Sequence, residues 1–205
     1  MEVVASGLQF PEGPIAMPDG SVILVEIARG TISRVQPDGS VEVVCETGGG
    51  PNGIAFGPDG RLYVCNNGGF PTFVDGKGRT RIGEGPDSEV ELGYIQAVDI
   101  ATGRAETLYT EVDGRHLSAP NDIVFDAAGG FWFTDHGKTW ERQRDHGGIY
   151  YAKPDGSFIE EVIYPVEGPN GIGLSTDDSR LFVAETHTGR VRYWDIASPG
   201  KLTSP

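Results

Sequence analysis

The chain has 205 residues, enough for one domain with a sizeable hydrophobic core. Its formal net charge of −14 disfavours nucleic acid and anionic membranes as partners, because both attract basic surfaces. No apolar run reaches the length of about 18 residues that a membrane span needs, and no signal peptide is recognisable, so we expect a cytoplasmic protein. Cys45 and Cys65 have no metal-like spacing and are expected to be buried thiols in a reducing compartment.

A tripeptide with Pro first and Glu or Asn second recurs four times along the chain. It begins at Pro11, Pro51, Pro120 and Pro169, so the copies lie 40, 69 and 49 residues apart. The longest spacing contains an insertion at residues 68–93. Without the insertion, the period is close to the roughly 40 to 50 residues of a four-stranded propeller blade.

Short β-branched and aromatic runs, bounded by Gly, Pro or Asp, predict strands within these units. After the first unit the runs are, in chain order, residues 53–56, 61–67, 94–100, 105–112, 122–125, 131–135, 147–153 and 157–164. Pro-Asp-Gly predicts a tight turn at each of residues 18–20, 37–39, 58–60 and 154–156. No segment has sustained helical periodicity, so we predict an all-β propeller. It forms a single, incomplete domain with about four blades, near residues 8–47, 48–113, 117–166 and 167–205.

Propeller geometry places two sets of oxygen-bearing residues at one mouth of the central channel. In a blade the first strand lines the channel and the second runs antiparallel beside it. The start of the first strand therefore meets the end of the second. The first-strand residues are Glu12, Asn52, Asn121 and Asn170, and the second-strand residues are Glu26, Asn66, Asp135 and Glu185. The alternative is that these side chains only satisfy local hydrogen bonds at strand ends.

Glu and Asn oxygens that converge without cysteine or clustered histidine suit a hard cation such as Ca²⁺. One carboxylate with several neutral amides would bind such an ion without fully neutralising its charge, which preserves its Lewis acidity. We therefore interpret Glu12 as the source of negative charge and the Asn positions as sources of neutral oxygens.

Three segments carry a resemblance to a known family: FPEGP, APNDIVFDAAGGFWFTD and GPNGIGLSTDDSRLFVAETHTGRVRYWDI. They resemble the gluconolactonase and regucalcin (senescence marker protein) family of six-bladed propellers, and the resemblance covers the whole chain. It implies a divalent metal held by Glu12 and Asn170, with Asn121 at both metal and substrate. It also implies a lactonase-type hydrolase of a sugar lactone or similar cyclic ester, using Ca²⁺ or, alternatively, Zn²⁺, Mg²⁺ or Mn²⁺.

The resemblance leaves the catalytic residue unassigned. The family Asp that is taken as the general base would fall beyond Pro205, so we expect this chain to be a fragment of a longer protein. Asp135 and Glu26 are the nearest stand-ins for that base, and neither is favoured. Asn52, Asn121, Asp135 and His116 are the candidate substrate-binding residues.

Two loops are expected to emerge at the mouth, at residues 68–93 and 136–148. The second contains Lys, Arg and His, so it either holds an anionic or hydroxylated substrate or is simply a solvated loop. Two other functions stay open: a non-enzymatic calcium-binding propeller, and a related propeller hydrolase of another ester class. The expected partner is a small lactone or ester, and the sequence predicts no oligomeric state.

Overall fold

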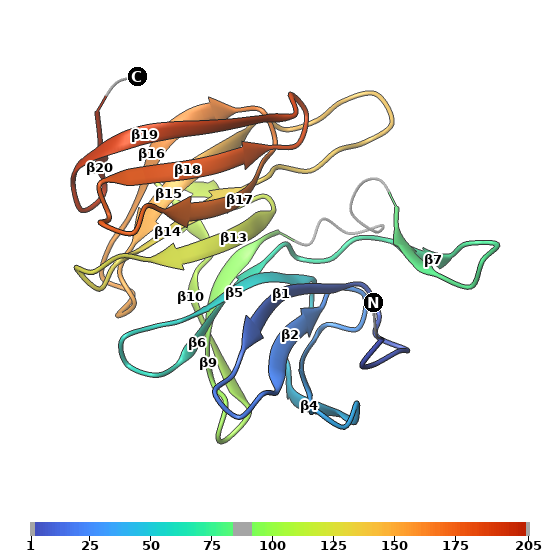
Figure 1. Ribbon diagram of the computed structural model, residues 1–205. Coiled ribbons are helices and arrows are strands. Elements are labelled where there is room, and N and C mark those ends of the chain that lie inside the picture. Colours follow the sequence, from blue (N-terminus) through green and yellow to red (C-terminus); the bar gives the residue numbers. More distant parts are fainter. Residues whose placement is uncertain (1–2, 84–91, 204–205) are drawn as a thin grey trace.

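The computed structural model describes residues 3–83 and 92–203. Within these two ranges all regular secondary structure is β-strand. The strands form four four-stranded antiparallel sheets and two two-stranded hairpins. The four sheets are arranged side by side as propeller blades (Figure 1), which confirms the predicted all-β propeller. The described residues contain no helix that could span a membrane.

The first two blades contain the N-terminal half of the chain. The first blade consists of β1 (Pro11–Ala16), β2 (Val22–Glu26), β3 (Thr31–Val35) and β4 (Val41–Glu46). The second consists of β5 (Pro51–Phe56), β6 (Leu62–Asn66), β9 (Tyr94–Asp99) and β10 (Arg104–Tyr109). The insertion between β6 and β9 carries the hairpin of β7 (Thr72–Val74) and β8 (Thr80–Ile82).

The last two blades follow a short hairpin of β11 (Glu111–Val112) and β12 (Arg115–His116). The third blade consists of β13 (Pro120–Phe125), β14 (Phe131–Asp135), β15 (Gly147–Ala152) and β16 (Ile159–Val166). The fourth consists of β17 (Pro169–Leu174), β18 (Arg180–Glu185), β19 (Arg190–Ser198) and β20 (Lys201–Leu202). The first strands contact one another in the order β1, β5, β13, β17, so they form the inner wall of the arc.

The four predicted Pro-Asp-Gly turns are all present. Their glycines have positive φ angles of 83°, 85°, 80° and 78° at Gly20, Gly39, Gly60 and Gly156. Each glycine N–H donates to the carbonyl oxygen three residues earlier, as a tight turn requires. Only glycine adopts this left-handed conformation at no steric cost, which explains the recurrence of the motif.

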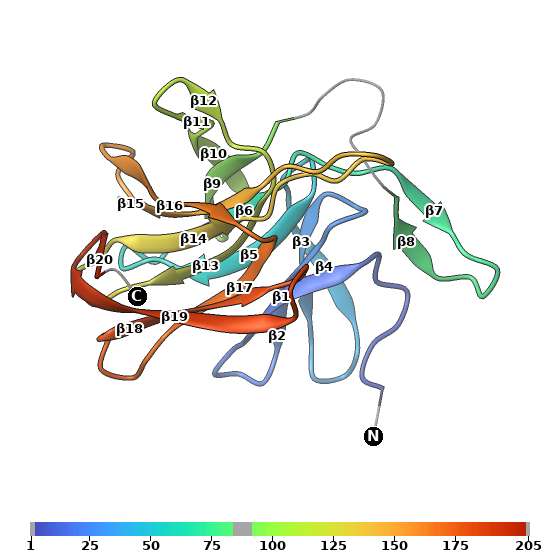
Figure 2. The same ribbon diagram turned by 90° about the horizontal axis from the view of Figure 1, so that it is seen from above.

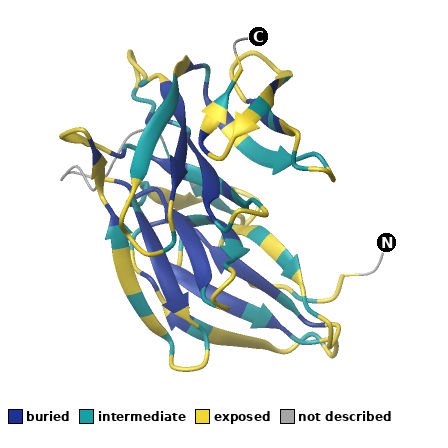
Figure 3. Ribbon diagram, turned by 90° about the vertical axis from the view of Figure 1, so that its left-hand side faces the viewer, coloured by how far each residue is buried: buried dark blue, intermediate teal, exposed yellow. Residues whose placement is uncertain are grey.

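The hydrophobic core consists of three clusters, and each cluster fills the space between two successive blades. The second strands β2, β6 and β14 are mostly buried, whereas the outermost strands β4 and β10 are mostly exposed or half-buried (Figure 3). Cys45 and Cys65 are buried free thiols within two of these clusters, as the sequence predicts. Burial raises the pKa of both thiols, so they remain protonated.

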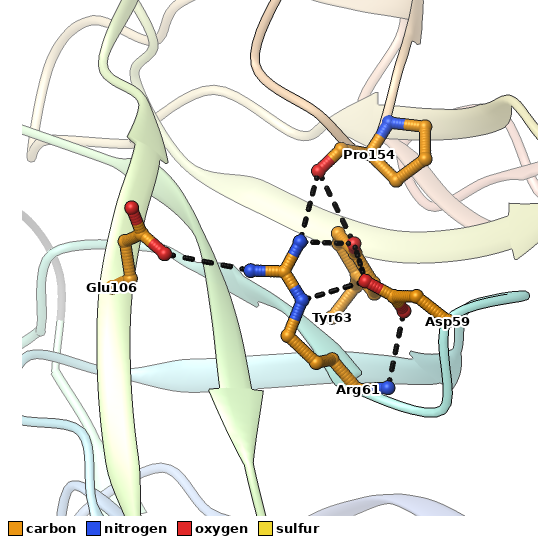
Figure 4. Close-up of polar contacts among 5 residues, drawn as sticks. All are labelled: Asp59, Arg61, Tyr63, Glu106 and Pro154. Carbon is orange, nitrogen blue, oxygen red and sulfur yellow. Dashed lines mark hydrogen bonds and ion pairs between the residues drawn. The ribbon is translucent and has the colours of Figure 1, made fainter.

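A polar network joins the second and third blades at the end of the sheets opposite the Pro-Glu/Asn tripeptides (Figure 4). Arg61 donates to Pro154 O at 3.2 Å, to the Tyr63 hydroxyl at 3.0 Å and to Asp59 Oδ2 at 2.6 Å. Glu106 lies 3.4 Å from the same guanidinium. Burial and the neighbouring Asp59 raise the pKa of Tyr63 to about 12. The network anchors the β15–β16 turn to β6 and so fixes the angle between these blades.

Candidate active site

The four repeated tripeptides meet at one cavity. Its volume is about 370 Å³, and its lining includes the second residue of every tripeptide: Glu12, Asn52, Asn121 and Asn170. Glu12 and Asn170 are exposed, whereas Asn52 and Asn121 are half-buried. We call these four side chains the oxygen ring.

The backbone orients the side chains of the oxygen ring by the same feature, a β-bulge, in every blade. The proline of each tripeptide pairs with the last residue of the second strand, as Pro11 does with Glu26 and Pro120 with Asp135. The register then shifts within the next few residues of all four first strands. Such a bulge re-aims the side chains beside it, and bulges are common next to active sites.

The glycine after the Glu or Asn lets neighbouring first strands approach closely. A Cβ added to Gly13, whose φ is +53°, would lie 2.7 Å from Asn52 O. A Cβ added to Gly53 would lie 2.5 Å from Asp122 Cα and 2.6 Å from Asn121 O. Both contacts are with backbone, which has no flexible end that could move away. The glycines therefore set the width of the cavity by holding the ring residues of adjacent blades together.

The oxygen ring has bonding capacity that the protein does not use. Among the described residues, no hydrogen bond or ion pair engages the side chains of Glu12, Asn52 or Asn121. Asn170 donates an amide N–H to Thr186 Oγ1 at 3.3 Å, which leaves its amide oxygen available as a ligand. Carboxylate and amide oxygens of this kind fit a hard divalent cation. The described residues contain no cluster of three or more His, Cys, Asp or Glu that could hold a metal, so a cation here depends on the amides.

Asp122 is a member of the cavity lining that the sequence reasoning missed. Its Oδ2 accepts the N–H of Ile172 in β17 at 3.0 Å, and Oδ1 accepts its neighbour Ile123 N at 2.9 Å. Burial raises the pKa of this carboxyl, although both N–H donors act to lower it. The sequence did carry a signal, because Asp122 stands where the other three tripeptides have Gly. Its carboxylate joins the third and fourth first strands and adds negative charge beside the ring.

The second set of predicted oxygens does not point into this cavity. Glu26, which is fully buried, accepts Gln9 N at 2.7 Å and Ser33 Oγ at 2.6 Å. Asn66 accepts the N–H of Gly50 at 2.9 Å. Glu185 accepts Thr188 Oγ1 at 2.6 Å. The second set therefore lies at the predicted mouth, but its side chains hold backbone and hydroxyl groups there and do not line this cavity.

Asp135 is the clearest example of this structural role, which we call bracing because the side chain holds nearby backbone in place through hydrogen bonds. It is 3% exposed and accepts three backbone N–H groups, from Ser118 and Ala119 at 2.7 Å and from Gly137 at 3.0 Å. Burial raises the pKa of Asp135, and the three N–H groups partly oppose that shift. Asp135 and Glu26 are thus occupied by the protein itself and are poor stand-ins for a general base.

Two of the predicted substrate residues lie at another cavity. His116 and Asp135 line a space of about 550 Å³, together with residues of the 136–148 loop, and this space shares no lining residue with the oxygen ring. His116 belongs to the β11–β12 hairpin and lies 3.9 Å from Glu111. Of the four candidate substrate residues, only Asn52 and Asn121 therefore line the cavity of the oxygen ring.

The 136–148 loop is less cationic than its sequence indicates. Arg144 pairs with Glu167 at 2.6 Å, and His146 Nδ1 lies 3.5 Å from the same carboxylate. Lys138 is 2% exposed. His136 packs edge-to-face on His187 with ring centroids 5.3 Å apart. Burial, and then the charges of Arg144 and His136, lower the pKa of His187.

The other predicted mouth loop, residues 68–93, is partly described. Residues 72–82 form the β7–β8 hairpin, which projects beside the N-terminal segment in two views (Figure 1, Figure 2). Residues 84–91 of the predicted loop lie outside the described residues.

A family model described as the SMP-30/gluconolactonase/LRE-like region matches residues 10–205. The chain belongs to this family. Lactonase drp35 of Staphylococcus saprophyticus is 31% identical over 207 residues, which cover 100% of this chain and 56% of that protein. The gluconolactonase of Zymomonas mobilis is 26% identical over 227 residues, covering 100% of this chain and 57% of that protein. The chain thus spans little more than half the length of these curated relatives.

A solved gluconolactonase structure from Xanthomonas campestris superimposes on 98% of this chain and 63% of that one, with a TM-score of 0.74. The two sequences are 22% identical, so this likeness shows the shared propeller fold.

Proposed function

We propose that the protein is a divalent-metal-dependent hydrolase that opens a sugar lactone or a similar cyclic ester. The observation that supports this function is the oxygen ring, whose side chains line one cavity with oxygens that the described residues leave unbonded. Membership of the SMP-30/gluconolactonase/LRE-like family and the two curated lactonase relatives support the choice of a lactone as substrate.

Glu12, Asn121 and Asn170 would hold the cation, with Ca²⁺ as the first candidate and Zn²⁺, Mg²⁺ or Mn²⁺ as alternatives. When bound, such a cation would supply Lewis-acid chemistry, polarising the lactone carbonyl and stabilising the charge that develops on its oxygen. Asn52 presents both an amide donor and an amide acceptor to the sugar hydroxyls. Asp122 ties β13 to β17 and so preserves the separation between Asn121 and Asn170.

The reaction adds water across the ring ester, breaks the acyl carbon–oxygen bond and yields one hydroxy acid. Proton removal from that water requires a base, and no described carboxylate is assigned to this role. Glu26 and Asp135 already accept hydrogen bonds from other groups of the protein, so neither is free to approach the substrate.

The test is hydrolysis of D-glucono-1,5-lactone, followed by acid release in a pH-stat after chelation and again after Ca²⁺ is restored. Glu12→Gln and Asn170→Ala should each abolish the Ca²⁺-dependent rate. Glu42→Gln is the matched control, because Glu42 is an exposed carboxylate on the outer strand of the same blade. Ca²⁺ binding without turnover of any lactone or ester would instead favour a non-enzymatic calcium-binding propeller.

A further inference from the structure

A second cavity adjoins the oxygen ring. It has a volume of about 630 Å³ and is lined by residues 7–12 of the N-terminal segment and residues 78–81 of the β7–β8 hairpin. Glu12 lines both this cavity and the central one. A ligand that reaches Glu12 from the central cavity can therefore extend a substituent toward the hairpin.

The hairpin presents two arginines to this second cavity. Arg79 immediately precedes β8 and Arg81 lies within it, and both residues line the cavity. Both donate Nε–H to one oxygen, Asp75 Oδ2, at 2.9 Å and 3.0 Å. The other oxygen of Asp75 accepts the backbone N–H groups of Lys77 and Arg79 at 2.9 Å and 3.0 Å. The shared carboxylate fixes the position of both guanidiniums before any ligand arrives.

One carboxylate does not neutralise two guanidiniums. Beyond Asp75, the described residues provide no further acceptor for Arg79 or Arg81, whose side chains are 55% and 43% exposed. The terminal N–H groups of Arg81 therefore remain available to a ligand. The hairpin carries a local excess of positive charge on a chain whose formal net charge is −14. A guanidinium presents its donors in a planar fork that matches the oxygens of a carboxylate or a phosphate.

We propose that Arg79 and Arg81 form a subsite that selects lactones carrying a carboxylate or phosphate substituent. This inference rests on the proposed lactone hydrolysis, which places the reacting ring at the oxygen ring. The volume of the second cavity is within the usual range of about 300 to 1,000 Å³ for small-molecule sites. Asp75 is a positioning residue, because it acts on the ligand through the two arginines.

The kinetic test compares a neutral lactone, D-glucono-1,5-lactone, with D-glucaro-1,4-lactone and 6-phospho-D-glucono-1,5-lactone. Arg79→Gln and Arg81→Gln should each lower kcat/KM for an anionic lactone about tenfold, which corresponds to about 1.4 kcal/mol. The same variants should leave the neutral lactone within about twofold, since it carries no charge to lose. Comparing kcat/KM for the carboxylate-bearing and the phosphate-bearing lactone shows which of the two anions the subsite prefers.

Lys77→Gln is the matched control. Lys77 is exposed on the same hairpin and does not line the cavity, so its substitution removes the same charge without touching the subsite. Equal losses in Lys77→Gln and the two arginine variants would reduce the effect to general electrostatics and overturn the proposal. Thermal melting of each variant confirms that the fold is intact.

A binding experiment separates this inference from the proposed function. D-glucose 6-phosphate and D-glucose differ by one phosphate, and neither contains a lactone. One outcome is that calorimetry detects binding of D-glucose 6-phosphate to wild type but to neither arginine variant, while wild type shows no lactonase rate. This outcome would overturn the hydrolase but support the anion subsite. A measurable lactonase rate with equal use of neutral and anionic lactones, unchanged in both variants, would support the hydrolase and overturn the subsite.

Discussion

Asp135 gives the sharpest test of the distinction between bracing residues and the oxygen ring. Its carboxylate accepts three backbone N–H groups in a site that is 3% exposed. Leaving a buried donor without a partner costs about 1–3 kcal/mol. Because water can enter the space and serve some donors, we expect Asp135→Ala to lower the free energy of unfolding by about 3–6 kcal/mol. A loss of this size is a large share of the roughly 5–15 kcal/mol that stabilises a typical domain.

The assay is urea unfolding followed by tryptophan fluorescence, because Trp132 is fully buried in the same strand, β14. Asp155→Ala is the matched control, since Asp155 also accepts two hydrogen bonds but lies in an exposed turn of the same blade. The control should barely change the unfolding midpoint. If Asp135→Ala were as stable as the control but lost Ca²⁺ affinity, Asp135 would belong to the binding site and the bracing role would be refuted.

Two further predictions concern packing at the ring and the histidine pair beside it. Gly53→Ala should lower the free energy of unfolding by about 1–3 kcal/mol in the same urea assay, because the new methyl would meet the backbone of Asp122. Gly173→Ala is the control and should be neutral, because a Cβ at that position has no neighbouring atom within 4 Å. Equal stability of the two variants would contradict the close-packing argument. The pKa of His187 should lie below 6.5 in an NMR titration, so its contribution to stability is present above pH 6.5 and is lost as the pH falls through the lower folded-state value. Arg144→Gln should move that pKa upward, and an unchanged value would contradict the role of the Arg144 charge.

The sequence predicted the fold because the strand signals are local. Alternating apolar residues, Pro-Asp-Gly turns and a repeated tripeptide each lie within a few residues, and together they imply stacked four-stranded sheets. Residue spacing along the chain also predicted correctly which strand ends lie at the same mouth, as the pairing of Pro51 with Asn66 shows.

Side-chain direction could not be predicted from the same counting. Glu12 and Glu26 are both acidic residues at the same end of one blade, yet only Glu12 lines the cavity. Glu26 is engaged by Gln9 N, a donor 17 residues away along the chain, and spacing alone does not indicate that contact. His116 lies away from the expected site for another reason: it belongs to the β11–β12 hairpin, which places it at a separate cavity.

The account depends on Glu12 and the amides of the oxygen ring acting as cation ligands, and Ca²⁺ affinity measures this directly. The decisive measurement is isothermal titration of Ca²⁺ into chelator-treated wild type, Glu12→Gln and Glu42→Gln. We predict one Ca²⁺ site, weakened by at least about tenfold in Glu12→Gln and unchanged in Glu42→Gln. Equal Ca²⁺ affinity in wild type and Glu12→Gln would contradict the assignment of the oxygen ring as the metal site.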